Sequence, residues 1–77
     1  MAKRKTDTIE LKKIMVEKRL DTIQALSEAS GISRNTLGPI INGNKNPTSE
    51  VIYKLISTLE IPPTKAGEIF FGTNLHN

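Results

Sequence analysis

The chain has 77 residues, 36% of them hydrophobic, and a net charge of +3, so we expect one small domain and no separate effector domain. The absence of cysteine excludes disulfide bonds and thiolate metal sites, and the single histidine, His76, stands too near the C-terminus to make a good metal ligand. No apolar run approaches the roughly 20 residues that cross a bilayer, and no signal-peptide core follows the basic N-terminus, so we expect a cytoplasmic protein.

Positive charge is concentrated at the N-terminal end of the chain. Residues 1–20 hold seven basic and three acidic side chains, and the remainder is close to neutral. The segment between Glu28 and Glu50 contains no carboxylate, although Arg34 and Lys45 lie within it. That segment therefore presents a surface that does not repel an anionic partner.

The first helix is predicted from Asp7 or Thr8 to Lys18, after a flexible basic arm at residues 1–6. Leu20 is expected to pack below the turn that follows the helix. Apolar residues recur at helical spacing within the helix and are expected to face the core. They are Leu11, Ile14 and Met15.

Residues 22–43 are predicted to form two short helices joined by a turn that is centred on glycine. Thr22 can cap the first of these helices by accepting a hydrogen bond from a free backbone N–H. Gly31 can adopt the left-handed conformation without steric cost, so the chain turns sharply before Ile32 fills the corner between the helices. The inward face of the first helix is expected to carry Ile23, Leu26 and Ala29. This arrangement is a helix-turn-helix signature.

Ser33 is predicted to cap the second helix of this pair. The residues expected to face inward are Leu37, Ile40 and Ile41. The residues expected nearer the outer face are Arg34, Asn35, Thr36, Gly38 and Asn42. Gly43 and the polar residues 44–46 end the helix, and Pro47 prevents its continuation.

A fourth, strongly amphipathic helix is predicted to begin after a cap at Thr48 or Ser49, with Glu50 near the positive end of the helix dipole. Its apolar residues repeat at positions i, i+3, i+4 and i+7. They are Ile52, Leu55, Ile56 and Leu59. The sequence Ile-Pro-Pro at residues 61–63 breaks this helix.

A last short helix is predicted from about Thr64 to Phe70, which gives an all-α fold of five helices over residues 7–71 and a frayed tail at residues 72–77. The residues expected to dock this helix on the core are Ile69 and either Phe70 or Phe71. The aromatic residues are expected to serve in the core or at a dimer interface rather than to stack on bases. They are Tyr53, Phe70 and Phe71.

These features together resemble the Cro and lambda-repressor-like helix-turn-helix domains of phage and bacterial regulators over residues 9–70. The resemblance is carried by Leu11 with Lys12, by LSEASGISRNTL at residues 26–37, by INGNKNP at residues 41–47, and by the apolar row of the fourth helix. It implies a compact all-α DNA-binding domain whose third helix lies in the major groove.

The resemblance also implies roles for polar residues around the turn. Arg34 can bind a guanine edge or a phosphate, and Asn35 can pair with an adenine edge; each good bidentate contact discriminates by roughly 1 to 3 kcal/mol. The positions that match base contacts are Ser33, Arg34, Asn35 and Gly38. The positions expected to contact phosphate are Thr22, Gln24, Thr36, Asn42, Asn44 and Lys45, although the asparagines are also good turn residues. The basic arm is either a minor-groove arm or a solubilising terminus, and its residues are Lys3, Arg4 and Lys5.

Two departures from the family pattern bear on these roles. Ile23 stands where many relatives have a polar residue that contacts phosphate, so that contact is missing or has moved to Gln24. Pro39 lies past the first turn of the third helix, where it removes a hydrogen bond to the Asn35 carbonyl and clashes with that carbonyl, at a cost of about 3 kcal/mol in an ordinary helix. We therefore expect this helix to kink or end early. Gly38 supplies flexibility, and its missing side chain lets the backbone approach DNA closely.

No catalytic constellation is visible. The chain has no Ser/His/Asp or Cys/His set and no glycine-rich phosphate loop after a strand, so we expect neither an enzyme nor a metal or other cofactor. We expect a transcriptional regulator of Cro-like or repressor type, from a phage or mobile element, that associates with the nucleoid and binds double-stranded operator DNA as a homodimer. The alternative is an antirepressor or antitoxin that uses the same fold to bind a second regulator or a toxin protein.

Overall fold

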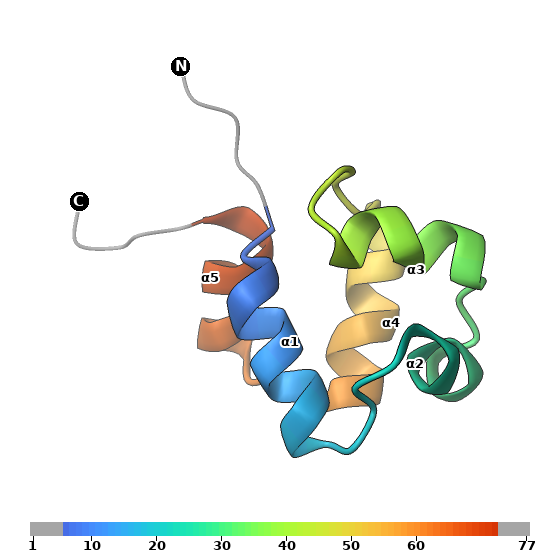
Figure 1. Ribbon diagram of the computed structural model, residues 1–77. Helices are drawn as coiled ribbons and strands as arrows, with labels where there is room; N and C mark the ends of the chain where they lie inside the picture. Colours follow the sequence, from blue (N-terminus) through green and yellow to red (C-terminus); the bar gives the residue numbers. More distant parts are fainter. Residues whose placement is uncertain (1–5, 73–77) are drawn as a thin grey trace.

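The computed structural model describes residues 6–72, which form five α-helices. They are α1 (Thr8–Glu17), α2 (Ile23–Ser30), α3 (Arg34–Ile41), α4 (Ser49–Leu59) and α5 (Pro63–Phe71). In Figure 1, α2 and α3 form one side of the molecule, α1 and α5 form the other, and α4 lies between them. The expected all-α architecture is confirmed. The proposed arm residues Lys3, Arg4 and Lys5, the tail beyond Gly72 and His76 lie outside the described residues.

Side-chain caps start the first four helices, and the caps of α2, α3 and α4 lie where the sequence predicts them. Each capping oxygen accepts the backbone N–H three residues further on. The capping residues are Asp7, Thr22, Ser33 and Thr48. Helix α5 instead begins at Pro63 after Pro62, with no side-chain cap. A proline in the first turn has no N–H that needs a partner there.

The turn between α2 and α3 closes as predicted. Gly31 adopts the left-handed conformation with φ of +77°, and Ile32 is 5% exposed in the corner between the helices. The Ser27 hydroxyl donates to the Ile32 carbonyl, and the Ile32 N–H donates to the Ser30 Oγ. These two hydrogen bonds hold the buried isoleucine from both sides of its backbone.

The inward face of α2 differs from the prediction at one position, because Ala29 is exposed. Leu26 is fully buried and Ile23 is half-buried, so the core lies between these two directions around the helix. With about 100° per residue, position 30 falls on that side and position 29 falls well off it. Ser30 is accordingly half-buried.

All five helices contribute to one hydrophobic core, with Leu20 packed against its edge. The residues with no exposed surface in this core are Leu11, Leu26, Leu37, Leu55, Leu59 and Ile69. On α4, Ile56 is only half-buried, whereas the rest of the predicted apolar row is buried. On α5, Phe70 docks on the core and Phe71 remains 44% exposed. The core therefore selects one of the two adjacent phenylalanines.

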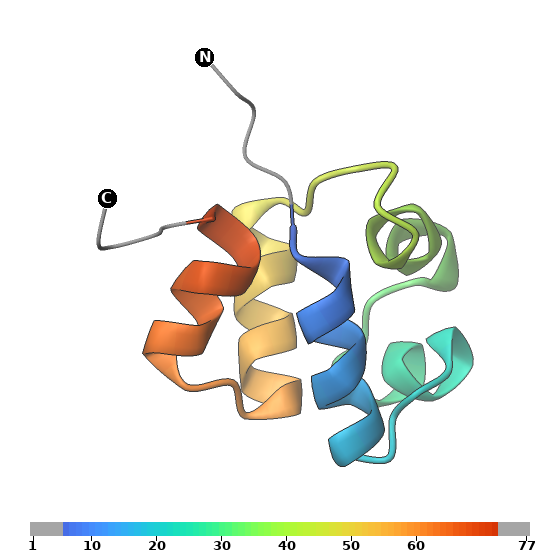
Figure 2. The same ribbon diagram turned by 60° about the vertical axis from the view of Figure 1, so that its left-hand side comes forward.

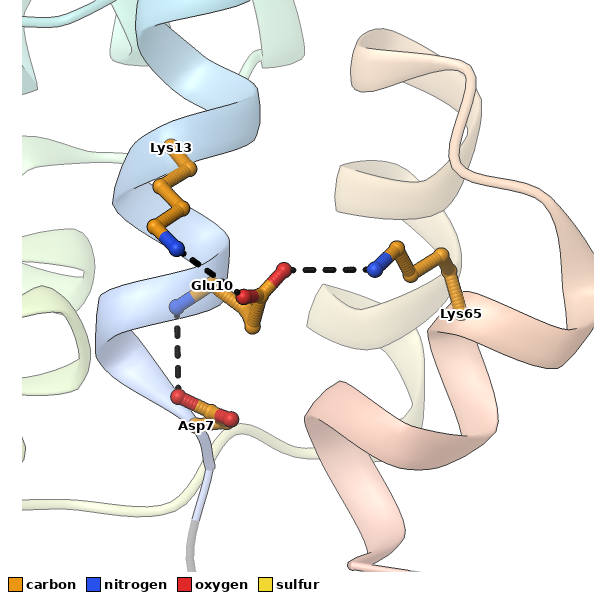
Figure 3. Close-up of polar contacts among 4 residues, drawn as sticks. All are labelled: Asp7, Glu10, Lys13 and Lys65. Atoms are coloured by element: carbon orange, nitrogen blue, oxygen red, sulfur yellow. Dashed lines mark hydrogen bonds and ion pairs between the residues drawn. The ribbon is translucent and has the colours of Figure 1, made fainter.

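Polar contacts join the start of α1 to α5. The Asp7 N–H donates to the Ile69 carbonyl at 2.7 Å. The Glu10 carboxylate lies 3.4 Å from the Lys13 ammonium and 3.3 Å from the Lys65 ammonium, as Figure 3 shows. The hydrogen bond and charge of Lys65, followed by those of Lys13, hold the pKa of Glu10 below its ordinary value. No helix of the described part is long and apolar enough to cross a membrane.

Candidate nucleic-acid interface

Helix α3 lies at the surface with its apolar side against the core. Its buried residues are Leu37, Ile40 and Ile41, as predicted. Its exposed residues, with the C-cap, are Arg34, Asn35, Thr36 and Asn42, and Gly38 is half-buried. Figure 2 views α3 almost along its axis, with α2 below it and the outer side of α3 uncovered by the other helices. A polar strip of this helix is therefore available to a partner.

Helical geometry identifies the centre of that strip. At about 100° per residue, Asn35 and Pro39 lie one turn apart and point away from the buried side. Asn42 lies close to the same line, and Gly38 lies on its flank. Asn35, Gly38 and Asn42 were predicted near this face, whereas Pro39 was predicted only to disrupt the helix. Its spacing of four residues from Asn35 was the signal that places Pro39 on this face.

Pro39 was expected to kink α3 or to end it early, and the early end is wrong because the helix continues to Ile41. The Asn42 N–H donates to the Gly38 carbonyl at 3.0 Å, and the Asn44 N–H donates to the Pro39 carbonyl at 2.8 Å. Gly43 adopts the left-handed conformation with φ of +84°, which completes this C-terminal motif. Proline has the φ that a helix requires, and its missing N–H removes one hydrogen bond, the one to the Asn35 carbonyl. Pro39 is the third residue from the end of α3, so the loss of this hydrogen bond does not terminate the helix.

The cap of α3 engages two of the predicted contact residues with each other. The Ser33 Oγ accepts the Thr36 N–H at 3.2 Å and donates to the Thr36 Oγ1 at 2.9 Å. The Ser33 hydroxyl proton is thereby used within the protein, whereas the Thr36 hydroxyl proton remains available to an acceptor. Both residues are exposed.

A hollow of about 160 Å³ lies between the start of α3, the α3–α4 loop and the start of α4. Asn35 and Thr36 line it from α3, Lys45 from the loop, and Thr48 from the cap of α4. The structure therefore brings one predicted base contact and two predicted phosphate contacts around a single depression. Within the described residues, neither Lys45 nor Arg34 has a carboxylate within ion-pair distance.

The start of α2 is less open to a ligand. The Thr22 Oγ1 accepts the Ala25 N–H at 3.0 Å, so capping is its role in the free protein. The Gln24 side-chain amide donates to the Glu28 carboxylate at 3.4 Å, and a phosphate would have to replace that bond. Ile23 is half-buried and packs against the core. Its apolar side chain therefore serves packing and offers no hydrogen bond to a phosphate.

A second, apolar surface lies where α4 meets α5. Tyr53 is 72% exposed and Phe71 is 44% exposed, and both line a hollow of about 110 Å³ with Ile56. Neither aromatic residue lines the hollow next to α3. Residues 6–72 contain no group of three or more His, Cys, Asp or Glu side chains placed to hold a metal ion.

Comparison with known proteins identifies a helix-turn-helix family model that the sequence of this chain matches. A family model described as helix-turn-helix matches residues 11–65, which run from the middle of α1 to the start of α5 and include the Gly31 turn. No curated protein and no solved structure gives a significant match.

Proposed function

Because the chain belongs to the Cro and lambda-repressor-like helix-turn-helix family of DNA-binding transcriptional regulators, we propose that it recognises a specific double-stranded operator by placing α3 in the major groove. The observation that carries this proposal is the outward face of α3. Its polar residues are exposed, its Arg34 lacks an ion-pair partner within the described part of the chain, and no carboxylate occurs between Glu28 and Glu50.

The side chains at the start of α3 suit the edges of bases. The Arg34 guanidinium can donate two parallel hydrogen bonds to guanine O6 and N7, and the Asn35 amide can pair with adenine N6 and N7. A side chain added at Gly38 would meet nothing within 4 Å in the free protein, so the space there is open to a groove edge. We propose Ser33 as a weaker contact, because its hydroxyl proton is committed to Thr36.

Phosphate contacts are proposed on either side of α3. Lys45 supplies charge from the α3–α4 loop, next to Thr36 at the same hollow. Such contacts fix the position of a protein on DNA without reading sequence. The remaining proposed phosphate contacts are Thr22, Gln24, Asn42 and Asn44, all of them exposed.

A homodimer on an inverted repeat is proposed as the functional state. One helix-turn-helix unit covers a short half-site, and two units placed about one helical turn apart read a longer operator. The exposed side chains Tyr53 and Phe71 supply an apolar surface on α4 and α5, away from the reading face of α3. A twofold-symmetric contact uses the same surface on both copies, and the exposed Tyr53 and Phe71 are the residues proposed for it.

Selection from random duplexes, followed by binding measurements at two salt concentrations, tests the proposal. We expect a palindromic motif, and we expect Arg34→Ala and Asn35→Ala each to weaken binding about 10- to 100-fold, in line with 1 to 3 kcal/mol per bidentate contact. Both residues are exposed, so neither substitution should change the melting temperature. Lys54→Ala removes a cation that is paired with Glu50 and serves as the matched control. Absence of salt-dependent binding to any duplex would refute the proposal.

An early end of α3 at Pro39 and an apolar side chain at Ile23 without a role in the core would favour the protein-partner alternative. The helix continues through Pro39 to Ile41, and the apolar side chain of Ile23 is accounted for by the core. Weak binding without a motif, together with recovery of a partner regulator or toxin, is the result that would favour this alternative.

A further inference from the structure

Pro39 lies on the outward face of α3 but has no role in the interface proposed above. It follows Asn35 by one helical turn, on the side of the helix opposite the buried Leu37 and Ile41. The ring is half-buried and the amide of Asn35 is exposed. If Asn35 enters a DNA groove, the ring of Pro39 therefore faces the same groove.

The chemistry of the pyrrolidine ring limits what it can cover there. The ring offers only CH₂ groups and neither donates nor accepts a hydrogen bond. In the major groove, the amino, carbonyl and ring-nitrogen groups of bases all require hydrogen bonds, whereas the C5-methyl of thymine is apolar. A polar edge covered by the ring would lose water without gaining a partner. A thymine methyl has no hydrogen bond to water that it could lose, and it gains an apolar contact with the ring.

Helical spacing defines where that thymine should lie. Four residues advance about 6 Å along a helix axis, and stacked base pairs are about 3.4 Å apart. Pro39 should therefore meet a base pair one or two steps from the pair that Asn35 contacts. The ring has little conformational freedom because it is closed onto its own backbone nitrogen, and the hydrogen bonds donated by Asn42 and Asn44 keep the end of α3 helical around it.

We infer that Pro39 is a specificity-determining residue that recognises thymine through its C5-methyl group. The inference rests on the proposed function, because it requires α3 to enter the major groove. It also accounts for a proline in a helix interior, where its missing N–H leaves the Asn35 carbonyl without the donor of an ordinary helix.

The test uses the duplex recovered by selection with the wild-type protein, in which each thymine is replaced by deoxyuridine, one position at a time. This removes one methyl group and leaves the hydrogen-bonding edge of the base unchanged. We expect about a fourfold loss of affinity at one thymine of each half-site, which corresponds to the burial of one methyl group. In Pro39→Ser this loss should disappear at that thymine and remain unchanged at every other position.

Pro47→Ser is the matched control, because it makes the same chemical change in the α3–α4 loop. It should keep the thymine-to-uracil affinity ratio of the wild type. The inference is overturned if no uracil substitution weakens wild-type binding, or if Pro39→Ser retains the ratio; the recovered motif would still support the proposed function. If selection recovers no motif, the proposed function fails and the inference fails with it.

Discussion

The α2–α3 side of the molecule and the side formed by α1, α4 and α5 differ in how many of their basic side chains are held in ion pairs. Within residues 6–72, the ion pairs lie on α1, α4 and α5 or directly after α1 and α4. They are Glu10–Lys13, Glu10–Lys65, Lys18–Glu60 and Glu50–Lys54. Arg34 and Lys45, on α3 and the loop after it, have none. Lys12 on α1 and Arg19 directly after it also have no ion-pair partner within residues 6–72. A cation that is already paired gains less from an external phosphate than one that is not, so the contrast is between α4 and α5, whose Lys54 and Lys65 are paired, and the proposed DNA-binding surface.

Apolar exposure shows the same division. The large apolar side chains that remain exposed in the described part of the chain lie on α1, α4 and α5, and they are Ile9, Val16, Tyr53 and Phe71. The exposed side chains of α3 are polar. One side of the molecule therefore suits contact with protein, and the other suits contact with nucleic acid.

The largest expected effect comes from Leu37→Ala, which breaks the connection between the two sides. Leu37 has no exposed surface and anchors α3 on the shared core. Its truncation should lower the free energy of unfolding by about 2 to 5 kcal/mol, or abolish the cooperative transition in a domain of this size. Urea denaturation measures the change. Val16→Ala, at a residue 60% exposed, should shift stability by about 0.5 kcal/mol or less. Equal effects would contradict the existence of one shared core.

A smaller effect of opposite sign is expected from Pro39→Ala. The alanine N–H restores a bond to the Asn35 carbonyl, and this gain exceeds the greater freedom of the unfolded chain. We expect stabilisation by about 1 to 2 kcal/mol in thermal denaturation. Pro47→Ala, outside any helix, gains no such bond and should be neutral or destabilising. A loss of stability in Pro39→Ala would show that the ring packs better than its geometry indicates.

The contrast between Pro39 and Gly31 shows which features the sequence could predict. The caps and the Gly31 turn depend on groups within about four residues, so they follow from local chemistry. The effect of Pro39 depends on how close the helix end lies and on the hydrogen bonds beyond it. The choice between Phe70 and Phe71 likewise depends on how α5 docks against the core.

In the candidate site, the exposure of residues could be predicted from the sequence, but some of their hydrogen bonds could not. The spacing of apolar residues predicted the exposure of Arg34 and Asn35, and the structure confirms it. The hydrogen bonds that commit Ser33 to Thr36 and Gln24 to Glu28 were not predictable, because they depend on side-chain orientation rather than on position in the helix.

Lys45→Ala is expected to change the salt dependence of DNA binding. If Lys45 neutralises one phosphate, its loss should reduce the slope of log affinity against log salt by about 0.9 and weaken binding to all sequences alike. Lys54→Ala removes the same charge from α4, where Glu50 already pairs it. We expect that variant to keep the wild-type slope. Identical slopes in both variants would remove Lys45 from the interface.

The smallest effect on stability is expected from Lys65→Met, which breaks the ion pair between Lys65 on α5 and Glu10 on α1. Lys65 is the main cause of the lowered pKa of Glu10, and Lys13 contributes less. The substitution should therefore raise the Glu10 pKa towards its ordinary value without restoring it completely. Nuclear magnetic resonance titration of the Glu10 carboxyl measures the shift directly. Lys54→Met, on another ion pair, should leave the Glu10 titration unchanged.

The pH dependence of stability follows from the direction of that shift. A carboxylate whose pKa is lowered by folding stabilises the folded state at neutral pH, and this contribution is lost as the pH falls through the lowered pKa. Lys65→Met should therefore reduce the acid-dependent change in melting temperature slightly, because both partners are partly exposed to water. DNA affinity at matched salt should remain that of the wild type. A loss of affinity comparable to that of Lys45→Ala would place α5 at the DNA and abolish the division between the two sides.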